Sequence, residues 1–361
     1  MKKKFFHNNV VLLLILSFIL VTPIIAGDPE HFVIKADWKI SEKQALVNSN
    51  MTVHYYEKRY AVIIVGYYND SQYYQWFTND AQRQYDVLTK KYNFSDEDIY
   101  VLVTQIEEWA NNLGMDPTII DYTATLTNIT MVFTQLASVI SENDLLYVVV
   151  IDHGADTHHL YFKRLGIDID FWQGIFAHDT FFCLEKTENT NKEFMIPLIN
   201  LRKNTNQSEV GERVYDRELN EYTQMIHARR IIFVLQPCFS GGFINDLSGS
   251  NRVILTASTE AQLANAPFIG IFYHGLNGSA NDINQDGRIS LGEVYEYIAK
   301  NVSEWIQKYP DGNGGRFQFP LIDDNGDKIG HRNGDFGYKP NVLNKDGYIT
   351  ARIYDLSYEE V

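Results

Sequence analysis

The chain has 361 residues, of which 45% are hydrophobic and 14% aromatic, enough for one large α/β domain or two modest ones. Its formal net charge is −15. A surface of that sign repels nucleic acid and anionic lipid and favours solubility, so we expect no nucleic-acid partner.

The N-terminus has the features of a targeting segment. Lys2, Lys3 and Lys4 precede an uncharged apolar run over 10–26 that ends at the small residue Ala26. This pattern predicts a secretory signal peptide over 1–26, and the alternative is an uncleaved membrane anchor. We therefore expect a secreted or cell-surface protein without stable membrane insertion once the signal is removed. Glycosylation is also expected, because Asn-X-Ser/Thr triplets begin at Asn50, Asn69, Asn93, Asn128, Asn206, Asn277 and Asn301.

Strands and helices alternate along the middle of the chain. Apolar runs predict strands at 60–68, 98–103, 144–154, 231–235 and 252–258. Apolar residues spaced by three and four predict helices at 71–91, 126–140, 216–228 and 290–310. This order predicts an α/β fold with a mostly parallel sheet, helices on both faces and a three-layer sandwich.

The alternation also suggests boundaries. Polar breaks over about 155–215 predict an insertion between the third and fourth strands. We expect a signal peptide, an N-terminal extension and a main domain, followed by a C-terminal extension rich in Gly, Asp and Asn. Their bounds are 1–26, 27–57, 58–310 and 311–361.

Two of the predicted strands end in residues suited to nucleophilic catalysis. The third ends in "VVVIDHG", which places His153 and Gly154 just beyond it, and the fourth runs into "FVLQPCFSGG", which places Cys238 beyond it. In parallel sheets, sites form at the carboxyl ends of the strands. A thiolate is a nucleophile, and a nearby imidazole can take its proton. An active Cys238 is expected to have a lowered pKa and to alkylate rapidly near pH 6–7, whereas a buried structural thiol should not.

These motifs resemble those of cysteine peptidases with the caspase-like fold, and in particular the legumain family. The resemblance rests on "DHG" at 152–154 and "QPCFSGG" at 236–242, and it extends over about 58–310. It implies an endopeptidase in which Cys238 attacks a peptide carbonyl and His153 is the general acid and base. The amides of Gly154 and Cys238 would form the oxyanion hole.

The resemblance also suggests a substrate pocket. The stretch "VGYYNDSQYYQWFTNDAQRQY" resembles the first legumain block, but Trp76 stands where legumains carry the arginine that selects asparagine. "TNDA" is similar to a metacaspase motif whose Asp binds a basic substrate residue, and Asp80 occupies that place. Asp80, Gln236 and Ser258 are the candidate substrate-binding residues, and a peptide or protein is the expected substrate.

A second motif, "DINQDGRISLGE" at 282–293, fits the EF-hand calcium loop. Hard oxygen ligands at this spacing suit Ca²⁺, and no organic cofactor is expected. Because 268–278 lacks the pattern of an entering EF-hand helix, we expect one structural site. The stretch 323–330 has similar acidic spacing without a twelfth-position carboxylate, so we interpret it as a turn, with metal binding as the alternative. The predicted ligands are Asp282, Asn284, Asp286, the Arg288 carbonyl, Ser290 and Glu293.

The sequence thus predicts an exported, calcium-stabilised cysteine endopeptidase that acts through a thioester. Two alternatives use the same residues. The first is a catalytically silent calcium-binding interaction module outside the cell, and the second is a transpeptidase in which an amine replaces water.

Overall fold

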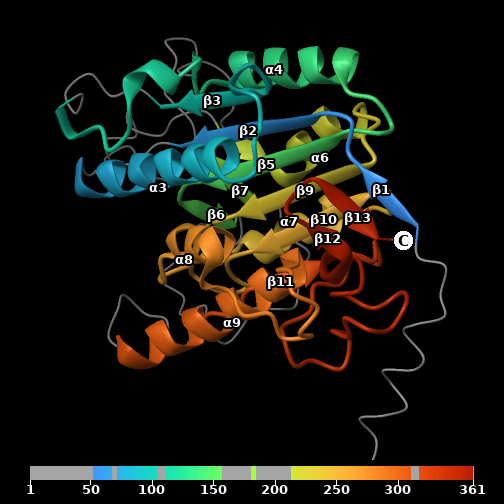
Figure 1. The fold of residues 1–361 in the computed structure, drawn as a ribbon. Helices are drawn as coiled ribbons and strands as arrows, with labels where there is room; N and C mark the ends of the chain where they lie inside the picture. The colour runs from blue at the N-terminus through green and yellow to red at the C-terminus, as the bar shows by residue number, and fades with distance from the viewer. Residues whose placement is uncertain are drawn as a thin grey trace, which may run out of the picture. The chain divides into compact units, whose positions relative to one another are not determined.

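A seven-stranded sheet forms the centre of the computed structural model, which describes residues 52–66, 71–104, 111–156, 180–183, 213–309 and 317–360 (Figure 1). Neighbouring strands are parallel except for β10 and β11, the pair at one edge of the sheet. In spatial order the strands are β11 (Leu321–Asp323), β10 (Arg252–Thr256), β9 (Arg230–Leu235), β5 (Leu145–Ile151), β2 (Arg59–Val65), β3 (Ile99–Val103) and β4 (Tyr122–Thr123).

The central strands are apolar on both faces. Along β5, Tyr147, Val149 and Ile151 pack into one core cluster, and the intervening Val148 and Val150 pack into a second cluster on the opposite face. Successive side chains of a strand point to opposite faces, so a run without polar residues requires a cover on both sides. This requirement explains why β5 reads as a continuous apolar segment.

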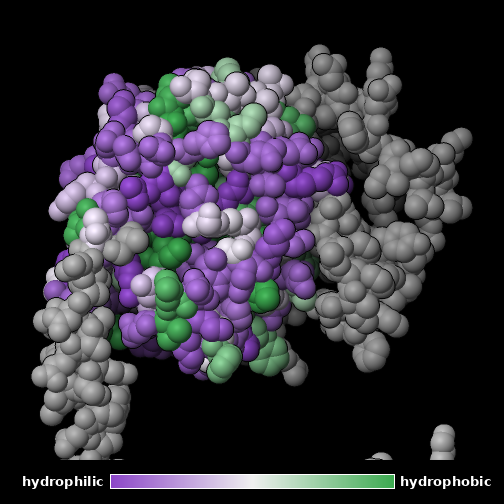
Figure 2. Space-filling model, turned by 90° about the vertical axis from the view of Figure 1, so that its right-hand side faces the viewer, coloured by the Kyte–Doolittle hydropathy of each residue, from purple (hydrophilic) through white to green (hydrophobic). Residues whose placement is uncertain are grey.

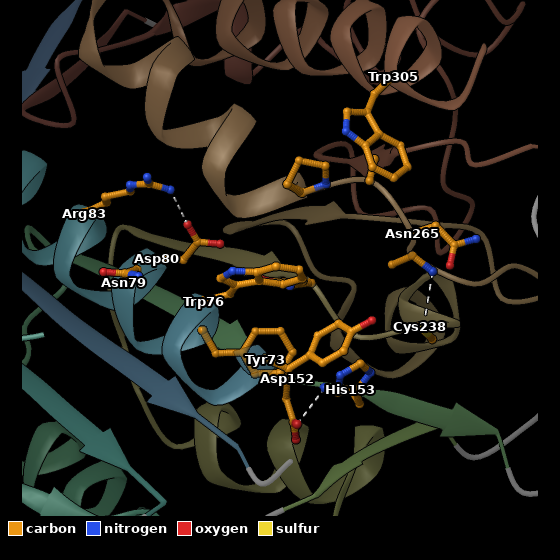
Figure 3. Close-up of a pocket in the computed structure, with 15 residues that line it drawn as sticks. Tyr73, Trp76, Asn79, Asp80, Arg83, Asp152, His153, Cys238, Asn265 and Trp305 are labelled. Atoms are coloured by element: carbon orange, nitrogen blue, oxygen red, sulfur yellow. Dashed lines mark hydrogen bonds and ion pairs between the residues drawn. The ribbon is translucent and has the colours of Figure 1, made fainter. Parts of the chain in front are cut away.

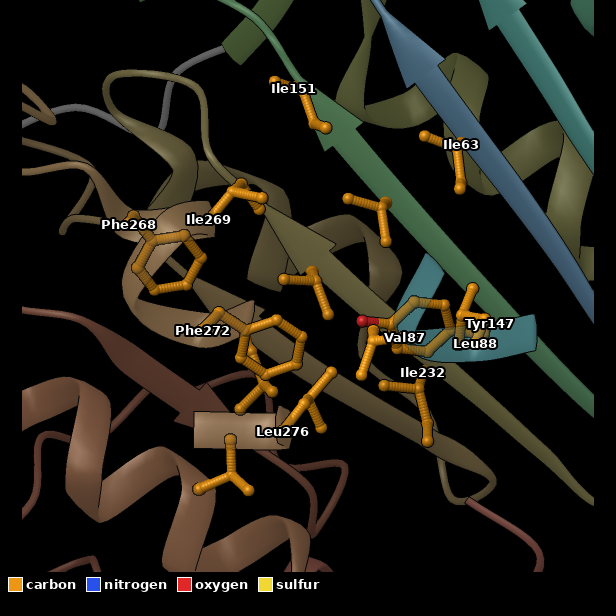
Figure 4. Close-up of a cluster of buried hydrophobic side chains, with 14 of the residues drawn as sticks. Ile63, Val87, Leu88, Tyr147, Ile151, Ile232, Phe268, Ile269, Phe272 and Leu276 are labelled. Carbon is orange, nitrogen blue, oxygen red and sulfur yellow. The ribbon is translucent and has the colours of Figure 1, made fainter. Parts of the chain in front are cut away.

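Helices provide that cover. The first face is covered by α3 (Ser71–Lys90), α8 (Phe268–His274) and α9 (Leu291–Lys308), and Figure 4 shows α8 side chains packed over β5 and β9. The second face is covered by α4 (Leu126–Val139), α6 (Asp216–Gln224) and α7 (Phe243–Leu247). The prediction of an α/β fold with a mostly parallel sheet and helices on both faces is confirmed, and the arrangement is consistent with three layers.

Local signals set the ends of these helices. Thr125 caps α4 by accepting a hydrogen bond from the Asn128 amide, and Ser290 and Glu293 form a capping box at the start of α9. The shorter helical turns are η1 (Asp96–Asp98), η3 (Pro117–Ile119), η6 (Ser240–Gly242), η7 (Gly275–Ser279) and η8 (Thr350–Arg352).

Two small antiparallel sheets flank the large one. The first contains β6 (Gly154–Asp156), β7 (Thr180–Cys183) and β8 (Arg213–Tyr215), and the second contains β1 (Val53–Tyr55), β13 (Tyr358–Glu360) and β12 (Ile353–Tyr354). The first therefore contributes strands to the predicted insertion at 155–215, but 157–179 and 184–212 lie outside the described residues. The predicted signal peptide at 1–26 and residues 27–51 of the N-terminal extension also lie outside them.

The C-terminal stretch is joined to the main domain. Strand β11 is an edge strand of the central sheet, although the sequence suggested an extension beginning at 311. The buried Glu359 carboxylate accepts hydrogen bonds from Arg230 at the start of β9, at 2.9 and 3.1 Å, and from the Tyr56 hydroxyl. Residues 52–361 accordingly form one compact unit.

The surface is mostly hydrophilic on the face that Figure 2 presents, where hydrophobic residues form small separate patches. Among the described residues, no helix combines the length and the apolar character that a membrane span requires.

Candidate active site

The register between β5 and β9 brings the two candidate catalytic residues level with each other. Val150 pairs with Leu235 in parallel, and the Gln236 amide donates to the Val150 carbonyl at 3.0 Å. His153 lies three residues beyond Val150, and Cys238 lies three residues beyond Leu235. Paired strands run about 4.8 Å apart, so the two residues emerge side by side at the carboxyl edge of the sheet.

The chain turns sharply at Cys238. Phe239, directly after Cys238, has a left-handed backbone with φ of 62°, which is unfavourable for a residue with a side chain. It is held there by burial and by its amide, which donates to the Gln262 carbonyl at 2.8 Å. This turn ends β9 and leaves Cys238 partly exposed while its neighbours are buried.

Glycine is required at 154 because the two strand ends approach closely. A Cβ atom there would lie 2.5 Å from the Cys238 carbonyl oxygen and 2.6 Å from Cβ of Pro237. Both distances are shorter than van der Waals contact. The "DHG" and "QPC" motifs are therefore packed directly against each other, and Pro237 forms part of that contact.

Ser240 has a structural role in this turn. It is fully buried, and its Oγ accepts hydrogen bonds from the amides of Ala257 and Ser258 at 3.1 and 3.3 Å. The hydroxyl thereby joins the turn after β9 to the end of β10.

A cavity of about 450 Å³ opens beside Cys238 (Figure 3). Cys238 and His153 lie at one end of it and the pair of Asp80 and Arg83 at the other. Its volume is in the range of small-molecule and side-chain pockets. The lining residues are Tyr73, Trp76, Phe77, Asn79, Asp80, Arg83, Asp152, His153, Gln236, Cys238, Ala264, Asn265, Ala266, Pro267 and Trp305.

Cys238 is a free thiol held by backbone amides. Its Sγ accepts a hydrogen bond from the Ala264 amide at 3.3 Å and another from the Gly154 amide. Burial raises the pKa of Cys238 above its ordinary value, Asp152 raises it further, and the amides of Ala264, Gly154 and Cys238 lower it. The expectation of a lowered pKa is therefore wrong for the resting site, because desolvation outweighs the amides.

His153 is neutral in this environment. Its ring lies against Tyr73 and Phe77 of α3, with ring centroids 5.7 and 5.1 Å apart, and its amide donates to the Asp152 carboxylate. Burial lowers the pKa of His153 to about 4. At neutral pH the imidazole is therefore unprotonated, and the same burial disfavours its cationic form.

Asp80 lies at the far end of the cavity. Its carboxylate is 2.9 Å from the Arg83 guanidinium, one turn further along α3. Burial raises the pKa of Asp80 to about 6, although Arg83 lowers it. Asp80 is 7% exposed, whereas the Arg83 side chain is 48% exposed, so Arg83 is free to turn toward solvent.

The cavity brings together most of the residues singled out from the sequence. Asp80, His153, Gln236 and Cys238 line it, and Gly154 contacts Cys238. Ser258 is fully buried beyond the end of β10 and is not part of the lining.

Sequence reasoning gave no role to several lining residues, among them Arg83, Asn265 and Trp305. Trp305 belongs to the apolar stripe of the predicted helix at 290–310. This pattern could have identified it as a residue that packs partly against the core. Asn265 lies in a loop that carries no motif, so only the folded chain places it in the cavity.

The predicted calcium loop at 282–293 has the backbone of a tight acidic turn. Gln285 and Gly287 have positive φ, of 61° and 85°. The Asp282 carboxylate accepts from the amides of Asp286 and Gly287 at 3.1 and 2.8 Å. The loop is preceded by the short α8 and the π-helical turn η7, in which Gly278 has a non-helical backbone.

Glu293 connects the end of the loop to its start. One oxygen of its buried carboxylate accepts from the amides of Ile283 and Asn284, and the other accepts from the amide and hydroxyl of Ser290. Within the described part of the chain, no three His, Cys, Asp or Glu side chains converge as a metal-binding group. The oxygen donors fit Ca²⁺ in type, and drawing Glu293 onto an ion would require its carboxylate to leave these donors.

Comparison with known proteins gives little further information. No family model and no curated protein matches the chain. Among solved structures, the chain is similar to the crystal structure of protein GSU0716 from Geobacter sulfurreducens, with a TM-score of 0.41 and 12% identity. That match covers 74% of this chain and 92% of the other.

The raised pKa of Cys238 predicts how the free protein reacts with iodoacetamide. Since only the thiolate reacts, the alkylation rate should still be rising above about pH 8.5, the ordinary value for cysteine. Peptide mapping of alkylated protein across a pH series, with Cys238→Ala as the blank, measures this rate. A rate that levels off below pH 7 would show a lowered pKa instead.

Proposed function

We propose that the protein is a cysteine endopeptidase with a caspase-like fold. The observation that carries the proposal is the convergence of His153 and Cys238 on one cavity, at the carboxyl ends of adjacent parallel strands. A neutral imidazole beside a thiol is the pair that nucleophilic acyl transfer needs. A purely structural cysteine would have no use for a cavity or for two amides directed at its sulfur.

Cleavage proceeds in two stages. Cys238 Sγ attacks the substrate carbonyl carbon while its proton passes to the imidazole of His153. The tetrahedral intermediate collapses as His153 returns the proton to the leaving amine, and a thioester remains. Water then attacks the thioester with His153 as base, which releases the carboxylic acid and restores the thiol.

The resting pair starts uncharged, and this makes the proton transfer the key event. The raised pKa of Cys238 and the lowered pKa of His153 both favour the neutral state in the buried site. When Cys238 attacks a substrate carbonyl, the negative charge that develops on the sulfur moves to the carbonyl oxygen. Proton transfer to His153 is therefore coupled to the attack. A variant that lacks the proton acceptor, such as His153→Ala, should therefore still bind the substrate.

Backbone amides supply the charge stabilisation. In the resting site three amides act on Cys238 Sγ, those of Ala264, Gly154 and Cys238 itself. The oxyanion is the former carbonyl oxygen, which is bonded to the same carbon as the attacking sulfur. Amides that surround the sulfur are therefore close to the oxyanion. The amides of Gly154 and Cys238 are the proposed oxyanion hole.

Asp80 is proposed to select a basic substrate side chain. Its carboxylate already holds a guanidinium, that of Arg83, and so it accommodates the chemical group that a substrate arginine would bring. Arg83 is half exposed and can be displaced toward solvent. The aromatic walls formed by Trp76 and Tyr73 also attract cations.

Calcium is proposed to stabilise the loop that leads into α9. Asp282, Asn284, Asp286, Ser290, Glu293 and the Arg288 carbonyl would hold the ion, which supplies positive charge to neutralise clustered carboxylates. α9 carries Trp305 at the cavity, so an ordered loop would help to position this wall.

The mechanism predicts that Cys238→Ala and His153→Ala each abolish cleavage of a mixed peptide library, by at least 10³-fold in kcat/KM. Mass spectrometry of the products measures cleavage. Cys183→Ala is the matched control and should retain activity. Undiminished cleavage by Cys238→Ala would rule out the mechanism.

The pocket predicts preferential cleavage after Lys or Arg, with a pH dependence set by Asp80. Because burial raises the pKa of Asp80 to about 6, the carboxylate is charged above that pH and neutral below it. KM for basic substrates should rise as the pH falls through this range, and Asp80→Asn should raise KM about 10- to 100-fold at neutral pH.

Arg83→Ala is the companion variant. It removes the internal competitor but also the charge that lowers the pKa of Asp80, so it is assayed at alkaline pH, where Asp80 is ionised and KM for basic substrates should fall or stay unchanged. Cleavage chiefly after Asn, unaffected by Asp80→Asn, would contradict the assignment.

The calcium loop predicts a rise in thermal stability on adding Ca²⁺, about 2.7 kcal/mol at a hundredfold excess over Kd. Asp282→Ala should remove this response, as seen by differential scanning calorimetry with Ca²⁺ or EDTA. Asp327→Ala, in the acidic turn at 323–330, is the matched control and should keep it. A wild-type protein that melts identically in Ca²⁺ and in EDTA would disprove the site.

A further inference from the structure

Two amide side chains in the cavity carry buried polar atoms that make no hydrogen bond within the described part of the chain. They are Oε1 of Gln236, an acceptor, and Nδ2 of Asn265, a donor. Buried polar groups in folded proteins are nearly always paired, because leaving one unpaired destabilises the fold. An unpaired donor and an unpaired acceptor in one cavity therefore point to a ligand that supplies both partners.

Both side chains come from the segments that hold the nucleophile. Gln236 ends β9, two residues before Cys238. Asn265 directly follows Ala264, whose amide donates to Cys238 Sγ at 3.3 Å. Figure 3 shows Asn265 next to Cys238 at the catalytic end of the cavity. A ligand that pairs with these amides is therefore positioned at the sulfur.

Gln318 fixes the backbone that presents Asn265. Its Oε1 accepts from the amides of Asn265 and Ala266, each at 2.7 Å, and its Nε2 donates to the Ala257 carbonyl at 2.9 Å. Gln318 is 2% exposed. Because this buried side chain anchors the loop to the end of β10, the backbone at Asn265 is fixed and only the torsions of its side chain can move its amide group. The binding group is held in place before the ligand arrives.

We propose that Asn265 and Gln236 bind the main chain of an extended peptide on either side of the attacked bond. Nδ2 of Asn265 donates to a substrate carbonyl, and Oε1 of Gln236 accepts from a substrate N–H. This inference rests on the proposed peptidase function. A secondary amide supplies an acceptor and a donor together, whereas a carboxylate supplies only acceptors and an ammonium only donors.

The variant that tests this is Asn265→Asp, which keeps the shape of the side chain and removes the donor. With a peptide substrate of the wild-type protein, kcat/KM should fall about 10- to 100-fold. The added carboxylate raises the pKa of Cys238 as Asp152 does, so alkylation by iodoacetamide is compared on the alkaline plateau, where the thiol is fully ionised; there the rate should stay within about twofold, since neither the sulfur nor its amide donors change. Asn277→Asp is the matched control, because Asn277 is exposed and outside the cavity lining, and it should leave kcat/KM unchanged.

A set of substrates locates the partner carbonyl. Non-scissile carbonyls of the peptide are replaced one at a time by a thiocarbonyl, which is a weaker acceptor and leaves the N–H uncharged. One replacement should lower kcat/KM of the wild-type protein about 10- to 100-fold and have little further effect on Asn265→Asp, since both changes weaken or remove the same hydrogen bond.

The outcomes separate this inference from the function on which it rests. Absence of any Cys238-dependent cleavage would overturn the peptidase proposal together with it. If Asn265→Asp cleaves the peptide as fast as the wild-type protein, the inference alone is overturned. It is also overturned if every carbonyl replacement lowers kcat/KM of Asn265→Asp by the same factor as it lowers that of the wild-type protein. If the melting curve shows that Asn265→Asp does not fold, the modified substrates are compared on the wild-type protein alone. Equal values of kcat/KM for all of them would then overturn the inference.

Discussion

The parallel pairing of β5 with β9 is the constraint on which the site depends. With Val150 opposite Leu235, the two strands end together, and the residues three places further on are His153 and Cys238. A shift of one residue would separate them and would also turn the side chains of the shifted strand to the other face, which would disrupt both core clusters. The packing energy of the core therefore fixes the geometry of the proposed dyad.

Burial then sets the chemistry. The carboxyl edge of the sheet is covered by α3 and by the loop before α8, so the thiol and the imidazole are both desolvated and both uncharged at rest. The same low polarity strengthens the hydrogen bonds from Gly154 and Ala264 to the sulfur. Uncharged reactants and fixed amides together suit a reaction in which charge appears only after the substrate is bound.

The sequence predicted the central sheet and its main helices because apolar runs and spacings of three and four reflect burial directly, as in β5 and α4. The placement of His153 and Cys238 followed from the rule for parallel strand ends. The sequence did not reveal Asn265, whose position depends on Gln318 more than fifty residues away. It also did not reveal β11, a strand of three residues. The raised pKa of Cys238 was also out of reach, since desolvation depends on the folded surroundings.

The central claim is that Cys238 forms a thioester with help from His153, and intact-protein mass spectrometry tests it most directly. The protein is mixed with an activated peptide ester and quenched in acid within the first turnover. The account predicts one added acyl group, mapped to Cys238, whose formation is lost in His153→Ala. An acyl group on another residue, or equal acylation of Cys238 in His153→Ala, would contradict it.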